Sequence, residues 1–184
     1  SSLLRLQSNR VNNREIQEVF QESQIRIRSM ALVHEMLYRS PDLSRVHFSA
    51  YLEVLVNSLY RSFRANPEQI TLSFELDDFS LPADLALSCG LIITELVSNV
   101  LKYAFPEGHR GELHLRAHQT PDHVVEIVVH DNGVGFPPEL DYRTTESLGL
   151  RLVMLLAGQL QGTVEVDRTN GMSFIITFKV TDRE

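Results

Sequence analysis

Apolar residues recur at helical spacing through most of the first 66 positions. The stripe comprises Ile16, Val19, Phe20, Ile25, Ile27, Met30, Ala31, Val33, Leu37 and Tyr38. It follows a polar break at residues 8–13 and stops at Ser40-Pro41-Asp42, so we expect a helix of about 25 residues, preceded by the end of another helix. Together they would form a helical hairpin. Because a lone hairpin cannot cover both apolar faces, the pattern favours a bundle shared between two chains, and hence a homodimer.

A further amphipathic helix is predicted over residues 48–63, and from residue 70 the chain alternates between strand and helix patterns. The predicted strands cover residues 70–76, 112–117, 124–129, 163–166 and 173–180, and the predicted helices cover residues 84–104 and 148–160. Asn170-Gly171 is typical of a hairpin turn. Helices separated by hairpins favour an α/β sandwich with its helices on one face of a mixed sheet, so the expected fold class of the chain is α+β.

The composition excludes several classes of protein. The 184 residues are 43% hydrophobic and carry a net charge of -7, which argues against a nucleic-acid-coating protein. A single cysteine, Cys89, excludes a disulfide framework and a cysteine-rich zinc site, so a reducing, cytoplasmic compartment fits best. No run approaches the roughly 20 apolar residues that cross a bilayer, so we expect no direct membrane contact.

The charge is divided unevenly along the chain. Residues 1–66 hold nine arginines against six acidic residues, whereas residues 67–184 hold eight basic residues against eighteen acidic ones. An arginine excess of this kind is typical of a solvated helix face, and docking of an acidic partner domain is the alternative.

Three polar residues interrupt the apolar helix predicted over residues 84–104. At 100° per residue, Glu95, Asn99 and Lys102 fall within about 60° of one another on one helix face. Oxygen ligands of this kind suit a divalent cation, and an adjacent lysine would reach a phosphate. An ordinary solvated face with an i, i+4 pair remains the alternative interpretation.

Glycine-containing segments follow this helix in the chain. Asp131 ends an apolar strand and is followed by Gly133 and Gly135, a pattern that suits recognition of a flat base by its exocyclic amine or, alternatively, a tight turn. Gly149 opens a helix whose free N–H groups could hold phosphate oxygens. Gly171 closes the last hairpin.

The order and spacing of these motifs resemble the ATP-binding domain shared by sensor histidine kinases, type II topoisomerases, Hsp90 and mismatch-repair ATPases. The resemblance covers residues 67–181 and rests on the segments Glu95-Leu96-Val97-Ser98-Asn99, Asp131-Asn132-Gly133-Val134-Gly135 and Leu148-Gly149-Leu150. It implies the Bergerat sandwich of the GHKL ATPases, with ATP and Mg²⁺ as cofactors.

The resemblance also implies roles for individual residues. Asn99 would coordinate Mg²⁺, Glu95 would polarise a metal-bound water or assist proton removal, and Lys102 would neutralise phosphate charge. Tyr103 would lie against the base or ribose, and Asp131 would accept a hydrogen bond from the adenine amine. Gly133 and Gly135 would let their loop approach the purine closely. The backbone and walls of the phosphate end would come from Leu148, Gly149 and Leu150, and Ser173 would lie near adenine. Met172 departs from the threonine common in the family and puts the role of Ser173 in doubt.

The first part of the chain is similar to the dimerisation and phosphotransfer helices of bacterial sensor histidine kinases related to the HWE type. The similarity rests on residues 1–7, the loop near Asn12 and the segment 26–38. It implies a phosphotransfer segment at residues 1–45, a catalytic ATP-binding domain at residues 46–184, and a response-regulator receiver domain as partner. The resemblance implies that the phosphoaccepting histidine lies on the first helix, upstream of Ser1. His34 belongs to the pattern of the second helix, where a packing or polar-helix role is expected and an acceptor role is the alternative.

Two other functions use the same pocket. An anti-sigma serine kinase would bind ATP and a sigma factor, but the arginine-rich hairpin argues against it. A non-catalytic nucleotide-binding scaffold is disfavoured by the joint presence of Glu95, Asn99, Lys102 and Asp131.

Overall fold

The helices and strands follow the predicted order closely. The computed structural model describes residues 14–39, 44–63, 65–106, 109–135 and 147–181. Its helices are α2 (Arg14–Arg39), α3 (Phe48–Ser62), α4 (Ala83–Asn99), the π-helical turn η1 (Val100–Ala104) and α5 (Leu148–Gln159). Its strands are β1 (Arg45–His47), β2 (Ile70–Leu76), β3 (Ser80–Pro82), β4 (Gly111–Gln119), β5 (Val124–Asp131), β6 (Thr163–Asp167) and β7 (Met172–Lys179).

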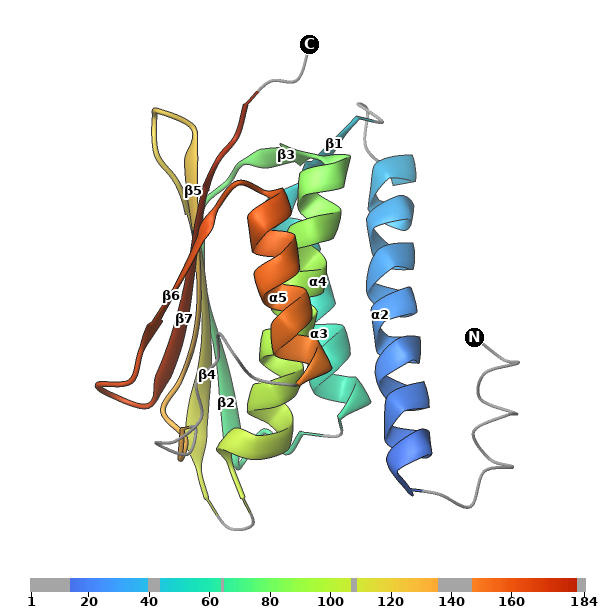
Figure 1. Ribbon diagram of the computed structural model, residues 1–184, viewed down its shortest axis with the longest axis vertical. Helices are drawn as coiled ribbons and strands as arrows, with labels where there is room; N and C mark the ends of the chain where they lie inside the picture. The colour runs from blue at the N-terminus through green and yellow to red at the C-terminus, as the bar shows by residue number, and fades with distance from the viewer. Residues whose placement is uncertain (1–13, 40–43, 64, 107–108, 136–146, 182–184) are drawn as a thin grey trace.

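A five-stranded sheet forms one layer of the molecule, in the order β2-β4-β5-β7-β6. β2 pairs in parallel with β4, and the remaining pairs are antiparallel, which confirms the expected mixed sheet. Helices α3, α4 and α5 cover one face of the sheet, and α2 lies on the side of these helices away from it (Figure 1). The α+β class predicted from the sequence is therefore confirmed.

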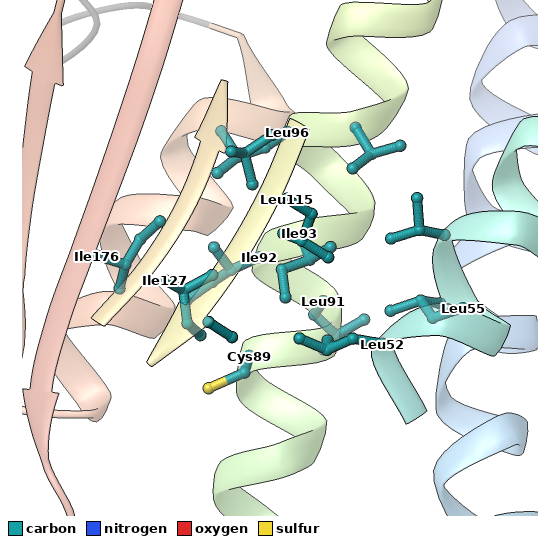
Figure 2. Packing of buried hydrophobic residues seen from close by; sticks show 14 of the residues in the cluster. Leu52, Leu55, Cys89, Leu91, Ile92, Ile93, Leu96, Leu115, Ile127 and Ile176 are labelled. Atoms are coloured by element: carbon teal, nitrogen blue, oxygen red, sulfur yellow. The ribbon is translucent and has the colours of Figure 1, made fainter. Parts of the chain in front are cut away.

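Helix α4 occupies the centre of the core. Its residues 91–98 are all buried, which explains why the helix is apolar on nearly every side. In Figure 2, Ile92 lies beside Ile127 of the sheet, whereas Leu91 lies toward Leu52 and Leu55 of α3. Alternate residues of β7 complete the core with side chains that are buried on the helical side of the sheet: Met172, Phe174, Ile176 and Phe178.

Two short features escaped the sequence patterns. β1 and β3 pair antiparallel as a separate two-stranded sheet, in which Val46 lies opposite Leu81. Three residues are too few to show an alternation, so no local signal predicts this pairing. The helix predicted to run regularly to residue 104 instead widens into the π-helical turn η1, a deviation that is frequent at functional sites.

One helix among the described residues is long and apolar enough to cross a membrane by length and composition. It runs from Ala83 to Ala104, and 67% of its most apolar window is buried inside the protein. The sequence analysis did not expect such a run. Burial among the sheet, α3 and α5 accounts for its apolar character as that of a core helix.

Removal of the Tyr51 hydroxyl should stabilise the protein. Tyr51 is fully buried, and its hydroxyl has no hydrogen-bond partner among the described residues; burial also raises the pKa of its phenol. Tyr51→Phe should increase the free energy of unfolding in urea by about 1 kcal/mol, because it removes a buried polar group without a partner.

Tyr60→Phe provides the matched control. The Tyr60 hydroxyl donates to the carbonyl of Ile70 at 2.5 Å, so its loss should lower the free energy of unfolding by about 1 kcal/mol. Equal losses in the two variants would show that the Tyr51 hydroxyl is bonded after all.

Candidate functional site

A small, largely apolar cavity of about 30 Å³ lies between α4, η1 and the ends of β5 and β7. It is lined by Leu96, Asn99, Val100, Tyr103, Ala104, Val129, Asp131, Gly135, Met172 and Phe174. Asp131 is the only carboxylate among the described residues of this lining, and it is 3% exposed. A single buried acceptor among apolar walls is suited to orient a flat ligand by one polar contact.

The backbone around Asp131 holds its carboxylate in place. The Asp131 Oδ1 atom accepts the N–H of Gly133 at 2.9 Å. Burial raises the pKa of Asp131, while the Gly133 N–H and nearby His130 oppose the shift. The carboxylate is therefore less well solvated than a surface aspartate, and a further hydrogen-bond donor would stabilise its charged form.

Two glycines allow the loops beside the cavity to pack closely. A Cβ at Gly133 would lie 2.3 Å from the carbonyl oxygen of Ala104, and the neighbouring Val134 N–H donates to that same oxygen at 2.9 Å. Gly171 has a φ of +87°, and a Cβ there would lie 2.0 Å from the Asp131 carbonyl oxygen. Larger residues at either position would displace the backbone that carries Asp131.

A second, more polar cavity of about 170 Å³ shares Asn99 and Tyr103 with the first. Its other lining residues come from α2, α4, η1 and the start of α5: Glu22, Ile25, Thr94, Glu95, Ser98, Lys102, Ser147, Leu148 and Gly149. The first N–H groups of a helix have no partners within the helix, so the start of α5 supplies donors beside this cavity. The two cavities together form an apolar part and a polar part of one candidate site.

Helix α2 makes ion pairs with both charged residues of this candidate site. Arg26 donates from Nε to Glu95 Oε1 at 2.6 Å and from a terminal nitrogen to Glu95 Oε2 at 2.8 Å. Lys102 Nζ donates to Glu22 Oε1 at 2.5 Å. Hydrogen bonding to Glu95 raises the pKa of Arg26, so the guanidinium of that pair stays charged.

The sequence analysis missed these ion pairs. Glu22 and Arg26 are an ordinary i, i+4 pair on α2, with a 3.6 Å contact to each other. Such a pair is most often a solvated feature of one helix. Nothing local to the sequence shows that both side chains also reach α4 and η1.

Most of the predicted site residues lie together. Asn99, Tyr103, Asp131 and Gly135 line the apolar cavity, and the polar cavity is lined by Glu95, Asn99, Lys102, Tyr103, Leu148 and Gly149. Gly133 packs against Ala104 beside Asp131. Leu150 lines neither cavity and belongs to the buried core.

Ser173, predicted to lie near adenine, does not line the apolar cavity. Its hydroxyl bonds His130 Nδ1 at 2.8 Å, while its neighbours Met172 and Phe174 line the cavity. Because side chains alternate along a strand, the serine between these two residues lies on the opposite face of the sheet.

The comparisons with known proteins agree with this arrangement. Residues 85–182 match the family model described as "Histidine kinase-, DNA gyrase B-, and HSP90-like ATPase". The chain belongs to this ATPase family. Residues 1–63 match a second model, HisKA_2, described as "Histidine kinase", so an ATPase-family unit follows a histidine kinase segment in one chain.

Individual relatives of this ATPase-family chain are sensor kinases. Sensor histidine kinase PdtaS of Mycobacterium tuberculosis is 32% identical over 166 residues, which are 89% of this chain and 32% of that protein. Blue-light-activated histidine kinase 2 of Erythrobacter litoralis is 28% identical over 99 residues, 54% of this chain and 29% of that protein. The chain thus spans about a third of the length of the curated relatives it matches.

A solved structure supports the fold of the ATPase-family chain. The histidine kinase domain of the Erythrobacter litoralis EL346 blue-light activated histidine kinase superposes with a TM-score of 0.78. Its sequence identity is 22%, and the match covers 95% of this chain and 92% of that one. The helical segment and the sandwich thus occur together in another protein.

Gly149 and Gly158, both in α5, should respond oppositely to alanine. A Cβ at Gly149 would lie 2.7 Å from Glu95 Oε2, an atom held by Arg26, whereas a Cβ at Gly158 meets nothing within 4 Å. Gly158→Ala should raise the free energy of unfolding by roughly 0.5–1 kcal/mol through helix propensity. Gly149→Ala should leave the free energy of unfolding unchanged or lower it, as measured by thermal and urea unfolding. An equal increase in the Gly149→Ala and Gly158→Ala variants would mean that the Glu95 carboxylate is free to move.

Proposed function

We propose that this chain is the ATP-binding catalytic part of a sensor histidine kinase. The observation that carries the proposal is the buried Asp131 carboxylate in an apolar cavity, adjoining a polar cavity at the start of α5. The matches to a histidine kinase model and an ATPase model support it. The proposed domain division is a dimerisation and phosphotransfer segment at residues 1–45 and a catalytic domain at residues 46–184.

Adenine would occupy the apolar cavity. Its exocyclic amine would donate to Asp131, and the Gly133 and Gly135 backbone would approach the ring closely. Tyr103, whose side chain is 63% exposed, would cover the base or ribose from the side of η1. A cavity of about 30 Å³ is smaller than a purine, so its walls would have to move apart for the base to enter.

The triphosphate would extend into the polar cavity, toward Lys102 and the N–H groups at the start of α5. Asn99 lines both cavities, and its amide oxygen suits a hard divalent cation. Among the described residues no group of three or more His, Cys, Asp or Glu could hold a metal ion, so phosphate oxygens and water would supply the other ligands. Bound Mg²⁺ would neutralise charge on the phosphates.

The chemistry would be phosphoryl transfer to an imidazole. A histidine ring nitrogen forms a bond to the γ-phosphorus while the bond from that phosphorus to the bridging oxygen breaks, and ADP departs with the electron pair. Glu95, beside the phosphate cavity, would accept the imidazole proton. The phosphoryl group would then pass to an aspartate of a response-regulator receiver domain, within a homodimeric kinase.

A non-catalytic nucleotide-binding scaffold is the second candidate function. The pairing of Glu95 with Arg26 and of Lys102 with Glu22 favours it, because both reactive groups are already neutralised in this arrangement. ATP turnover by the intact protein separates the two functions. The histidine kinase match over residues 1–63 argues against an anti-sigma serine kinase.

Asp131→Asn should reduce adenosine affinity by about tenfold or more, because a charged acceptor is lost. The parent's adenosine affinity should also depend on pH. Burial raises the pKa of Asp131, so the carboxylate that accepts the amine is fully present above that pKa and is lost as the pH falls through it. Adenosine affinity should be measured by calorimetry from pH 4 to pH 8, at intervals of about one pH unit. It should rise to a plateau with increasing pH in the parent but not in Asp131→Asn.

Equal adenosine affinity in the parent and Asp131→Asn would remove Asp131 from the base site. Asp122→Asn is the matched control, because Asp122 is exposed at the turn between β4 and β5. It should bind adenosine as the parent does at every pH.

Asn99→Asp should alter the metal dependence of ATP binding. The added charge repels phosphate when Mg²⁺ is absent and strengthens the proposed metal ligand when it is present. The factor by which Mg²⁺ improves ATP affinity should therefore increase, as measured by calorimetry at stepped Mg²⁺ concentrations. Asn57→Asp, at an exposed position of α3, makes the same charge change and should leave this factor unchanged. An unchanged factor in Asn99→Asp would exclude Asn99 as the ligand.

A further inference from the structure

A line of polar contacts joins α2 to α4 and η1. Along α2 it comprises Glu22, Arg26 and Ser29, at positions i, i+4 and i+7 of one helix face. Glu22 bonds Lys102, Arg26 bonds Glu95, and the buried Ser29 hydroxyl lies 2.8 Å from the hydroxyl of Thr94. The contacts are antiparallel in register, so α2 lies along the same helical strip that carries the candidate phosphate-binding residues.

The central pair is the better shielded of the two ion pairs. The Glu95 side chain is 8% exposed and the Arg26 side chain is 15% exposed, and their two hydrogen bonds form a bidentate fork. Loss of one partner from such a pair leaves a poorly solvated charge behind, which is strongly unfavourable. This contact therefore favours the docked position of α2.

The outer pair conflicts with the proposed ligand. Glu22 lines the polar cavity together with Lys102, and its side chain remains 31% exposed. A triphosphate in that cavity would require the Lys102 ammonium that Glu22 now holds, and would face the Glu22 carboxylate as a like charge. Docking of α2 and binding of phosphate thus compete for one cation. The apolar cavity, by contrast, is lined by none of the described side chains of α2.

We propose that α2 is a latch on the phosphate end of the site, whose docking through Glu22 and Arg26 opposes binding of a nucleotide polyphosphate. In the latched state Glu95 and Lys102 are both neutralised by α2. When the latch opens, Lys102 becomes available to phosphate and Glu95 to a proton. This inference rests on the proposed function, and it adds a coupling between the helical segment and the nucleotide that must act equally in both directions.

The test uses the 184-residue chain, two ligands and one charge change. Glu22→Gln keeps the shape of the side chain but removes the competing charge and weakens the hold on Lys102. Calorimetry should show Mg-ATP binding at least about fivefold tighter than in the parent, the lower end of ordinary coupling between sites, and unchanged affinity for adenosine, which has no phosphate. Glu53→Gln on the exposed side of α3 makes the same charge change and should alter neither affinity.

Hydrogen exchange provides a readout that does not require tighter binding. Mg-ATP should speed amide exchange in residues 22–33 of α2 in the parent chain, whereas adenosine should not. Glu22→Gln without nucleotide should already exchange faster there than the parent. Arg26→Lys keeps the charge but loses the bidentate fork, so without nucleotide its α2 amides should also exchange faster than those of the parent. Arg28→Lys, at an exposed position of α2, is the control and should exchange at the parental rate.

The outcomes separate the latch from the proposed function. Suppose that the parent binds adenosine and Mg-ATP, that Glu22→Gln binds both with parental affinity, and that amide exchange in α2 does not change with nucleotide. The latch is then overturned, and the nucleotide site stands. If neither the parent nor Glu22→Gln binds adenosine or Mg-ATP, the proposed function fails and the latch fails with it. Tighter adenosine binding in Glu22→Gln, equal to the gain for Mg-ATP, would also overturn the latch, because the effect would then not concern phosphate.

Discussion

The burial of α4 on nearly all sides is the constraint on which the rest of this structure depends. The helix must present apolar side chains to the sheet, to α3 and to α5, so only a narrow strip remains for polar groups. Glu95, Asn99 and Lys102 occupy that strip and its continuation into η1. Because the strip lies beside the ends of β5 and β7 and the start of α5, the two cavities of the candidate site form there.

The same strip receives α2. Polar groups on a mostly buried helix need partners, and those on α4 have two possible sets: the side chains of α2 or the phosphates and metal of a bound nucleotide. In the described arrangement the partners are the side chains of α2. A single helix face thereby serves both as an interface within the chain and as the lining of the candidate phosphate site, so the proposed nucleotide would be coupled electrostatically to α2.

The two halves of the candidate site differ in physical character. The end that holds Asp131 is apolar, and its one carboxylate is fixed by the Gly133 N–H and by tight glycine turns. The end that holds Lys102 is polar and partly exposed. A fixed acceptor at one end and partly exposed charged groups at the other suit a ligand with a flat ring and a charged tail.

Sequence patterns predicted the five main strands and helices α2 to α5, because these depend on local periodicity. The grouping of Asn99, Tyr103 and Asp131, which come from α4, η1 and β5, was implied by the family resemblance of the motif order and not by any local pattern. The short pairing of β1 with β3, the π-helical turn and the orientation of Ser173 were not predicted. Neither were the bonds of Arg26 and Glu22, which join residues 69 and 80 positions apart in the chain. Such contacts depend on how α2 packs against α4, and a helical pattern shows which side chains share a face but not which distant helix that face will meet.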